Sequence, residues 1–473
     1  MIIGFLFVFP LLVWLHLMLR DRIIGIVSTI IASIILSVIL VELISWVGQI
    51  KRESRVRHLP FFQMGLVIIY TNFCFPIFFP NTSIFSGIRV SSDMFDYAML
   101  GTLLFFFSFI LGYKRFFRET VKRRKLIYKW LPKIKNNNYN EITFAVWTML
   151  LISDVIAILF TGRLSMLEFG NPIMAVLLFI FEPSIVFGFH IYFYIVKKIS
   201  ARTIYISFAI AIIPAVINMT LHQIFLMIGT LAVSKFYVSK KLPIFLFFAL
   251  VLGYIILNPV KLMYRGIIQE HSVDSLSGKI ETIASGWSVA WEERNDIGKR
   301  DTMRNAGRFN ELILVADCMN KVPDVIDYGY GWSWRIILYN FIPRLLWTDK
   351  PILNDIGSSY WAWLFGYTSS TSLRETAANL PSIVDGYWNF GWLGISFIGL
   401  LFGFVGKFYA ITLNLQQPET VAAGVFLLKG FLTNRSLPDI VGAIPQKIIG
   451  IVVSLLLLKL LILMYSSFRL RRN

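Results

Sequence analysis

Apolar runs of about the length of a membrane-spanning helix recur through most of the chain. Six lie in the first half and three near the end, at residues 2–19, 23–47, 60–80, 95–113, 141–161, 171–197, 391–413, 420–433 and 446–466. A helix needs roughly 20 predominantly apolar residues to cross the hydrocarbon core of a bilayer. The pattern therefore predicts an all-α, polytopic membrane protein.

Residues 203–258 interrupt this regular series. The segment 203–234 is too long for one span and short for two, and Pro214, Asn218, His222 and Gln223 cluster in its middle. Such a cluster is typical of two short or broken helices that meet at the outer side of the membrane. Together with a further run at 243–258, they bring the predicted bundle to about twelve transmembrane helices.

Residues 259–390 form the only long polar interval, and they divide the chain into three predicted parts. An N-terminal bundle of about nine spans (1–258) precedes a large loop (259–390), and about three spans with a basic tail (391–473) follow it. Two stretches of the loop, RFNELILVADCM and WSWRIILYNFIPRLLW, have helical periodicity but contain arginines, which are costly at mid-bilayer. We expect amphipathic helices at the membrane surface there.

The distribution of charge predicts the topology. The loop KRESRVRH and the segment 114–135, which has ten Lys and Arg residues, are strongly basic, whereas 259–390 has 13 Lys and Arg against 15 Asp and Glu. Because cytoplasmic loops are enriched in cations, we expect both termini in the cytoplasm and 259–390 outside. The basic segments favour anionic lipid over nucleic acid as their partner. The first run lacks a basic leader, so we expect a retained span rather than a cleaved signal.

Composition excludes several classes of protein. With 56% apolar residues and a mean hydropathy of +0.68, the chain is too apolar for a soluble globule. Two cysteines and the absence of paired Cys/His spacing argue against a disulfide framework or a zinc site. No P-loop and no GxGxxG after a strand is present, so we expect neither a metal nor any other cofactor.

Cations recur through the external loop, where the charge rule disfavours them. A guanidinium is a planar fork of donors that can grip phosphate or carboxylate, so these residues indicate an anionic ligand. Pairing with the carboxylates of the loop is the alternative reading. The candidates are Arg265, Arg308, Arg335, Arg344, Lys350 and Arg374.

Two carboxylates of the loop are candidate bases. Asp385 lies just before the predicted run 391–413, at its outer end, and Glu375 precedes Asp385 by ten residues. A helix cap for Asp385 and an ion pair with Arg374 for Glu375 are the structural alternatives. His271 is the only histidine of the loop, so a histidine mechanism has little support.

Aromatic residues are also concentrated in the loop, which holds eight of the thirteen tryptophans. They could form an aromatic belt at the headgroups, or they could be stacking platforms for the C–H faces of sugars. Candidate platforms are Trp347, Trp361, Trp363 and Tyr387.

The order of residues in the last 170 positions resembles the O-antigen polymerases, the Wzy-type oligosaccharide repeat-unit polymerases. The matching features are Arg308 opening RFNELILVADCM, Pro323 followed by Gly331, FIPRLLWTDKP at 341–351, DGYWNFGWLGISFIGLLFG at 385–403, and NRSLPD at 434–439. The similarity extends to the whole chain only through topology. Many relatives have Glu where this chain has Asp385, which weakens the assignment of that residue as a base.

This resemblance implies a GT-C-like architecture in the bacterial inner membrane and a reaction at its periplasmic face. The growing glycan would pass from undecaprenyl diphosphate to the non-reducing end of the next lipid-linked repeat unit, as in lipopolysaccharide synthesis. Cations that hold the diphosphate would stabilise the leaving group, and Arg435 joins Arg265, Arg308, Arg335, Arg344 and Lys350 as a candidate. A co-polymerase that regulates chain length is a candidate partner.

Two other functions remain open. An O-antigen ligase has a similar architecture but is expected to depend on a loop histidine. A flippase or transporter of lipid-linked sugars would be expected to have inverted repeats and charges within its spans. Asp154 and Glu182 supply such charges, unless Lys407 or Lys429 neutralises them.

Overall fold

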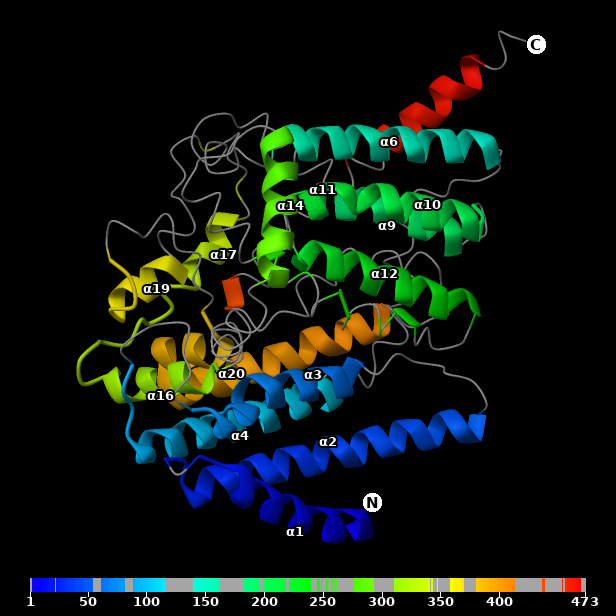
Figure 1. Ribbon diagram of the computed structural model, residues 1–473. Coiled ribbons are helices and arrows are strands. Elements are labelled where there is room, and N and C mark those ends of the chain that lie inside the picture. Colours follow the sequence, from blue (N-terminus) through cyan, green and yellow to red (C-terminus); the bar gives the residue numbers. More distant parts are fainter. Residues whose placement is uncertain are drawn as a thin grey trace.

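The structure, a computed structural model, is all-helical in the parts of the chain that it describes (Figure 1). The described residues are 2–21, 23–53, 61–80, 88–115, 139–160, 183–195, 199–217, 221–239, 276–292, 310–340, 358–369, 380–412 and 456–468, with short pieces between 245 and 261 and at 342, 347, 436–438 and 453. No strand occurs within these ranges.

One group of helices packs around the larger hydrophobic core (Figure 1). Its members are α1 (Ile2–Leu19), α2 (Ile26–Glu53), α3 (Phe61–Ile69), the π-helix η1 (Tyr70–Cys74), the 3₁₀ helix η2 (Phe75–Phe78), α4 (Ser92–Arg115) and α20 (Ser382–Thr412). Short loop helices, α16 (Leu312–Lys321) and α19 (Ser358–Leu364), contribute side chains to the same core.

A second group of helices has its own core. It consists of α6 (Tyr139–Phe160), α9 (Pro183–Ile195), α10 (Ala201–Ala211) and α12 (Leu221–Ser239), and Leu458 and Ile462 join its core. Helix α11 (Ile213–Ile217) packs with α12 in a separate small core. The break between α10 and α12 includes Pro214, as the sequence predicts, since proline cannot continue the hydrogen bonding of a helix.

Three of the described helices are long and apolar enough to cross a membrane: Ile26–Gln49, Ser92–Arg115 and Ser382–Lys407. Their contacts show that α2, α4 and α20 run in the same direction. Ser28 N donates to Asp96 Oδ1 at 2.9 Å near the start of α2 and α4, and Lys114 Nζ donates to Glu42 Oε1 at 3.0 Å nearer their ends. The predicted total of about twelve spans stays a prediction.

Helices α4 and α20 pack backbone against backbone. A Cβ built on Gly399 would lie 2.8 Å from the carbonyl oxygen of Phe105, and one on Gly112 would overlap that of Leu400. The second arm of α20 contains a small-xxx-small motif, Gly399 to Gly403, and α4 has Ser108 to Gly112. Small residues at this spacing let membrane helices approach closely when no hydrophobic effect drives them together.

Helix α20 is two arms joined by a sharp reversal. Phe390 and Gly391 are not helical, and Gly391 has φ of 59°, a conformation that favours glycine. A Cβ built on Gly386 would lie 2.8 Å from the backbone of Gly394, so the arms 382–389 and 392–412 pack closely where they meet. The second arm matches the predicted run 391–413 and is about 30 Å long, the thickness of a bilayer core.

The described helices of the long loop lie at one end of the bundle, α16 and α19 near the start of α20 and α14 (Leu276–Glu292) beside the second group, where it contacts α11 (Figure 1). They are α14, α16, α17 (Arg335–Asn340) and α19. Helix α16 differs from the predicted surface helix, because residues 312–319 are all buried. It packs on α4 and α20, and its apolar residues cover every side of the helix rather than one stripe.

We expect Gly112→Ala to lower the free energy of unfolding by about 1–3 kcal/mol, because the new methyl group would overlap the backbone at Leu400 and force the two helices apart. Gly48→Ala is the matched control, since a Cβ there meets no atom within 4 Å. Thermal unfolding followed by fluorescence-detected size exclusion compares the two. Equal melting temperatures would contradict close packing of α4 against α20.

Candidate functional site

Asp385 is fully buried in the short first arm of α20, where its carboxylate joins three segments of the chain. Oδ1 accepts hydrogen bonds from Ser333 Oγ at 2.6 Å and Asn389 Nδ2 at 3.0 Å. Oδ2 accepts from Trp334 Nε1 at 3.2 Å and from the backbone N of Leu437 at 2.9 Å. Four donors therefore surround this carboxylate, and these five residues are called the Asp385 network below.

The turn 329–334 is held against the end of the same arm. Gly329 N donates to the carbonyl oxygen of Trp388 at 2.8 Å, and Gly331 N donates to Asn389 Oδ1 at 2.9 Å. Tyr330 and Gly331 both have positive φ, 44° and 85°, which produces the sharp bend. Because the turn is fixed at both ends, the position of Trp332 within it is set by α20.

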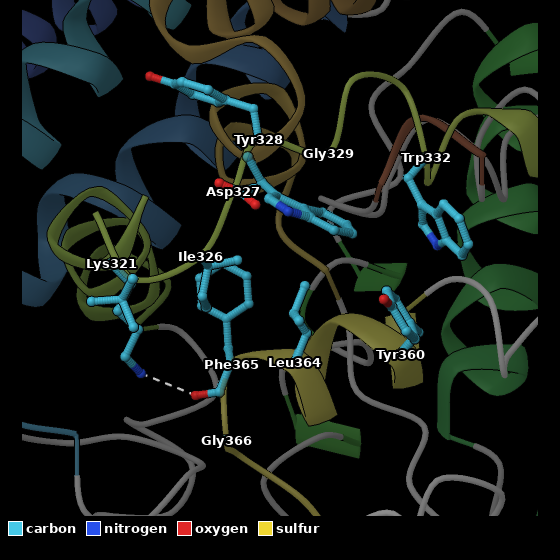
Figure 2. A pocket seen from close by; sticks show the side chains of 12 residues that line it. Lys321, Ile326, Asp327, Tyr328, Gly329, Trp332, Tyr360, Leu364, Phe365 and Gly366 are labelled. Carbon is cyan, nitrogen blue, oxygen red and sulfur yellow. Dashed lines mark hydrogen bonds between the residues drawn. The ribbon is translucent and has the colours of Figure 1, made fainter. Parts of the chain in front are cut away.

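A pocket of about 600 Å³ opens beside this turn (Figure 2). It is called the aromatic pocket here, and it is lined by Lys321, Val325, Ile326, Asp327, Tyr328, Gly329, Trp332, Tyr360, Leu364, Phe365, Gly366 and Trp388. Figure 2 shows Lys321 at one end and Trp332 with Tyr360 at the other, with Phe365 and Leu364 between them. Its volume lies in the range of small-molecule sites in proteins.

Exposed aromatic rings form one wall of the pocket and its rim. The ring centroids of Trp332 and Tyr360 are 5.4 Å apart, and those of Tyr360 and Trp363 are 5.6 Å apart. Trp332 is 36% exposed and Trp363 40% exposed. The guanidinium carbon of Arg335 lies 3.0 Å from the centroid of Trp332, and within the described part of the chain the buried Nε of Arg335 has no hydrogen-bond partner. A cation with an unused donor thus lies against this wall.

At the other end, the charge of Lys321 is already neutralised. Its Nζ donates to Asp317 Oδ2 at 2.8 Å and to the carbonyl oxygen of Phe365 at 3.0 Å. The Tyr367 hydroxyl also donates to Asp317 Oδ2. Burial and then the negative charge of Asp317 raise the pKa of Tyr367, so the hydroxyl stays protonated and remains a donor. This cluster fixes the end of α16 against the segment after α19.

Asp327 is the second charged residue among those that line the pocket. Its side chain is exposed, and within the described part of the chain no hydrogen bond or ion pair engages its carboxylate. The carboxylate of Asp327 can therefore accept hydrogen bonds from a ligand in the pocket.

Six of the predicted site residues lie within the described residues. Asp385 and Arg335 have the surroundings given above. Trp361 is fully buried and packs on Phe365 and Tyr367, Tyr387 is 8% exposed, and Trp347 packs edge to face on Tyr339. Among the predicted sugar-stacking residues, Trp363 therefore has the most exposed side chain. The other candidates lie outside the described residues: Arg265, Arg308, Arg344, Lys350, Arg374, Glu375 and Arg435.

Sequence reasoning did not single out Lys321, Asp327 or the contacts that position the turn. One signal was available, since Asp317 and Lys321 are spaced i and i+4, as are Asp385 and Asn389. No local pattern links Ser333 to Asp385, because 52 residues separate them.

These features define a helical protein with apolar helices long enough to cross a membrane and a pocket where the long loop packs on them. The chain belongs to the family described as Domain of unknown function (DUF8712), whose model matches residues 41–414. The matched region includes the aromatic pocket and α4 and α20. Neither a curated protein nor a solved structure matches the chain.

We expect Asp385→Ala to destabilise the protein by roughly 3 kcal/mol or more, because it leaves several buried donors without an acceptor, at a cost of about 1–3 kcal/mol each. Limited proteolysis of the purified protein should then cleave the loop faster. Asp324→Ala, which removes an exposed carboxylate, is the control. Wild-type protease resistance combined with lost activity would instead favour the prediction that Asp385 is a base.

Proposed function

We propose that this protein is a membrane-embedded glycosyltransferase that polymerises undecaprenyl-diphosphate-linked oligosaccharide repeat units at the periplasmic face of the bacterial inner membrane. The observation that carries the proposal is the aromatic pocket, built from loop segments at the end of the bundle where α20 begins. Exposed aromatic rings beside a free carboxylate suit a hydroxyl-rich ligand with apolar C–H faces.

The direction of the helices supports the proposed topology. Helices α2, α4 and α20 are parallel, so the three candidate spans would cross the membrane in the same direction. The basic segments that follow α2 and α4 favour the cytoplasm for the C-terminal ends of these helices. The pocket, near the start of α20, would then lie on the opposite side.

In the proposed reaction, a hydroxyl of the acceptor sugar attacks the anomeric carbon of the donor glycan. The bond between that carbon and the phosphate oxygen breaks, and undecaprenyl diphosphate leaves with the bonding electrons. A carboxylate takes the hydroxyl proton, and Asp385 and Glu375 stay candidates for that role. The diphosphate supplies the activation, so neither a nucleotide nor a metal enters the step.

Arg335 is the cation best placed to support this reaction among the described residues. It stacks on Trp332, a lining residue, and no group in the described ranges accepts a hydrogen bond from its Nε. A guanidinium beside the sugar pocket could hold the departing diphosphate, where negative charge grows in the transition state.

A transporter of lipid-linked sugars is the second candidate, and Asp154 favours it. Both carboxylate oxygens of Asp154 are buried in α6, and none of the residues that the structure describes donates a hydrogen bond to them. Lys407, one proposed neutralising residue, instead lies over the ring of Tyr113 at 5.0 Å. A buried charge within an apolar helix often marks a transport path.

Lipid-linked glycans from a deletion strain would separate these functions. Loss of a polymerase leaves single repeat units on the outer face of the membrane. Loss of a flippase traps them on the inner face, and loss of a ligase leaves long chains on undecaprenyl diphosphate. Either of the last two results would contradict the proposed polymerase.

We expect Arg335→Ala, expressed in the deletion strain, to reduce long chains roughly tenfold to a hundredfold, as loss of a ~1.5–3 kcal/mol hydrogen bond to a charged group predicts. Arg335→Lys should restore only part of the activity, because an ammonium lacks the planar fork. Arg344→Ala should behave like Arg335→Ala. Gel analysis of surface polysaccharide provides the measurement.

Lys114→Ala is the matched control for these variants. It removes an exposed cation whose ion pair with Glu42 lies near the far ends of α2 and α4, and such pairs contribute little to stability. Unchanged chain lengths in Arg335→Ala, with normal protein levels in the membrane, would remove Arg335 from the proposed site.

A further inference from the structure

The charges around the aromatic pocket distinguish between the two substrates of the proposed reaction. The donor presents a diphosphate with several negative charges, whereas the end of the acceptor presents sugar hydroxyls. A pocket for the diphosphate needs cations with unused donors. A pocket for sugar hydroxyls needs acceptors and apolar surface.

Lys321 does not meet the requirement for phosphate binding. Its ammonium already bonds Asp317 and the carbonyl oxygen of Phe365, and its side chain is only 27% exposed. A phosphate entering at this end would also approach the negative charge of Asp317, and like charges at close range are costly.

Asp327 excludes phosphate for the same reason and suits hydroxyls. An ionised carboxylate accepts hydrogen bonds through two oxygens and can therefore engage two neighbouring hydroxyls of one sugar ring. Its exposure and lack of partners within the described chain leave both oxygens available. Elsewhere in the pocket, Trp332 and Tyr360, whose ring centroids are 5.4 Å apart, supply apolar surface on which the C–H face of a sugar ring can rest.

We infer that the aromatic pocket binds the non-reducing end of the acceptor glycan, built of neutral or amino sugars, with Asp327 accepting hydrogen bonds from sugar hydroxyls and Trp332 stacking on a sugar ring. The diphosphate of the donor lies outside this pocket, on the side of Trp332 that carries Arg335. That the sugar belongs to an acceptor rests on the proposed polymerase function. The preference for an uncharged or cationic sugar over phosphate rests on the pocket alone.

Trp332 links the two substrates in this arrangement. Its indole lines the pocket, and the guanidinium of Arg335 stacks on the same ring. The turn that carries Trp332 is fixed to α20 through Gly329 and Gly331. The bound sugar and the held diphosphate would therefore keep a constant separation.

The test uses the full-length protein in lipid nanodiscs. The probes are oligosaccharides released by partial acid hydrolysis from the host's own surface polysaccharide and separated into neutral and acidic pools. Isothermal titration should show saturable binding of the neutral pool. Asp327→Asn and Trp332→Ala should each weaken it at least tenfold, and inorganic pyrophosphate should not displace it.

Two matched controls accompany these variants. Asp324→Asn changes an exposed carboxylate three residues away, and Trp287→Ala removes a 44% exposed indole on α14; neither residue lines the pocket. Both should bind as the wild type does. Size exclusion confirms that each variant is folded, which is expected for Asp327→Asn because, among the described residues, no hydrogen bond or ion pair of this exposed side chain would be lost.

Three results would overturn the inference: no binding of the neutral pool, binding that both pocket variants retain, or displacement by pyrophosphate. The deletion strain reports on the proposed function separately. Normal polymer in that strain together with sugar binding at the pocket would reject the polymerase and keep the sugar site. Loss of polymer without sugar binding would reject the site and keep the polymerase.

Discussion

A single buried carboxylate fixes the geometry of the pocket end of this protein. Asp385 accepts hydrogen bonds from the turn that carries Trp332, from its own helix arm, and from the backbone at Leu437. A buried carboxylate is stable only when hydrogen bonds replace the water that it loses. Since these segments are far apart in the sequence, satisfying one side chain requires all of them to assemble.

The need to satisfy buried Asp385 places fixed backbone segments directly beneath exposed side chains of the pocket. The Asp385 network fixes the turn that carries Trp332, and the contacts of Asp317 with Lys321 and Tyr367 fix the opposite end of the pocket. Asp327 and Trp363, in contrast, lie at exposed positions. Rigid support beneath accessible side chains is the arrangement that a binding site requires, because ordering the site then costs little free energy when a ligand binds.

Much of the fold follows from periodicity and charge, whereas the site does not. Hydrophobic runs predicted α1, α2, α4, α6 and the second arm of α20 to within a few residues, since hydropathy reflects the bilayer directly. The predicted run 60–80 is instead divided into α3, η1 and η2. The prediction that α16 lies at the membrane surface was wrong. This helix is apolar on all sides, and other segments of the protein enclose it. The concentration of aromatic residues in the loop predicts Trp361 as a sugar platform. The structure buries Trp361 against Phe365 and Tyr367, and such tertiary packing cannot be predicted from composition. Asp327 has no distinguishing motif, and only its exposed position in the lining of the aromatic pocket makes it a candidate.

The bond from Leu437 to Asp385 also has a consequence for biosynthesis. Residue 437 is synthesised well after residue 385. The carboxylate of Asp385 therefore lacks the hydrogen bond from Leu437 N while the intervening chain is made. During that time Oδ2 lacks one of its two hydrogen-bond donors. The pocket is therefore completed late, and a polypeptide that stops before this point would reach the membrane with its helices in place but with the turn around Trp332 incompletely anchored.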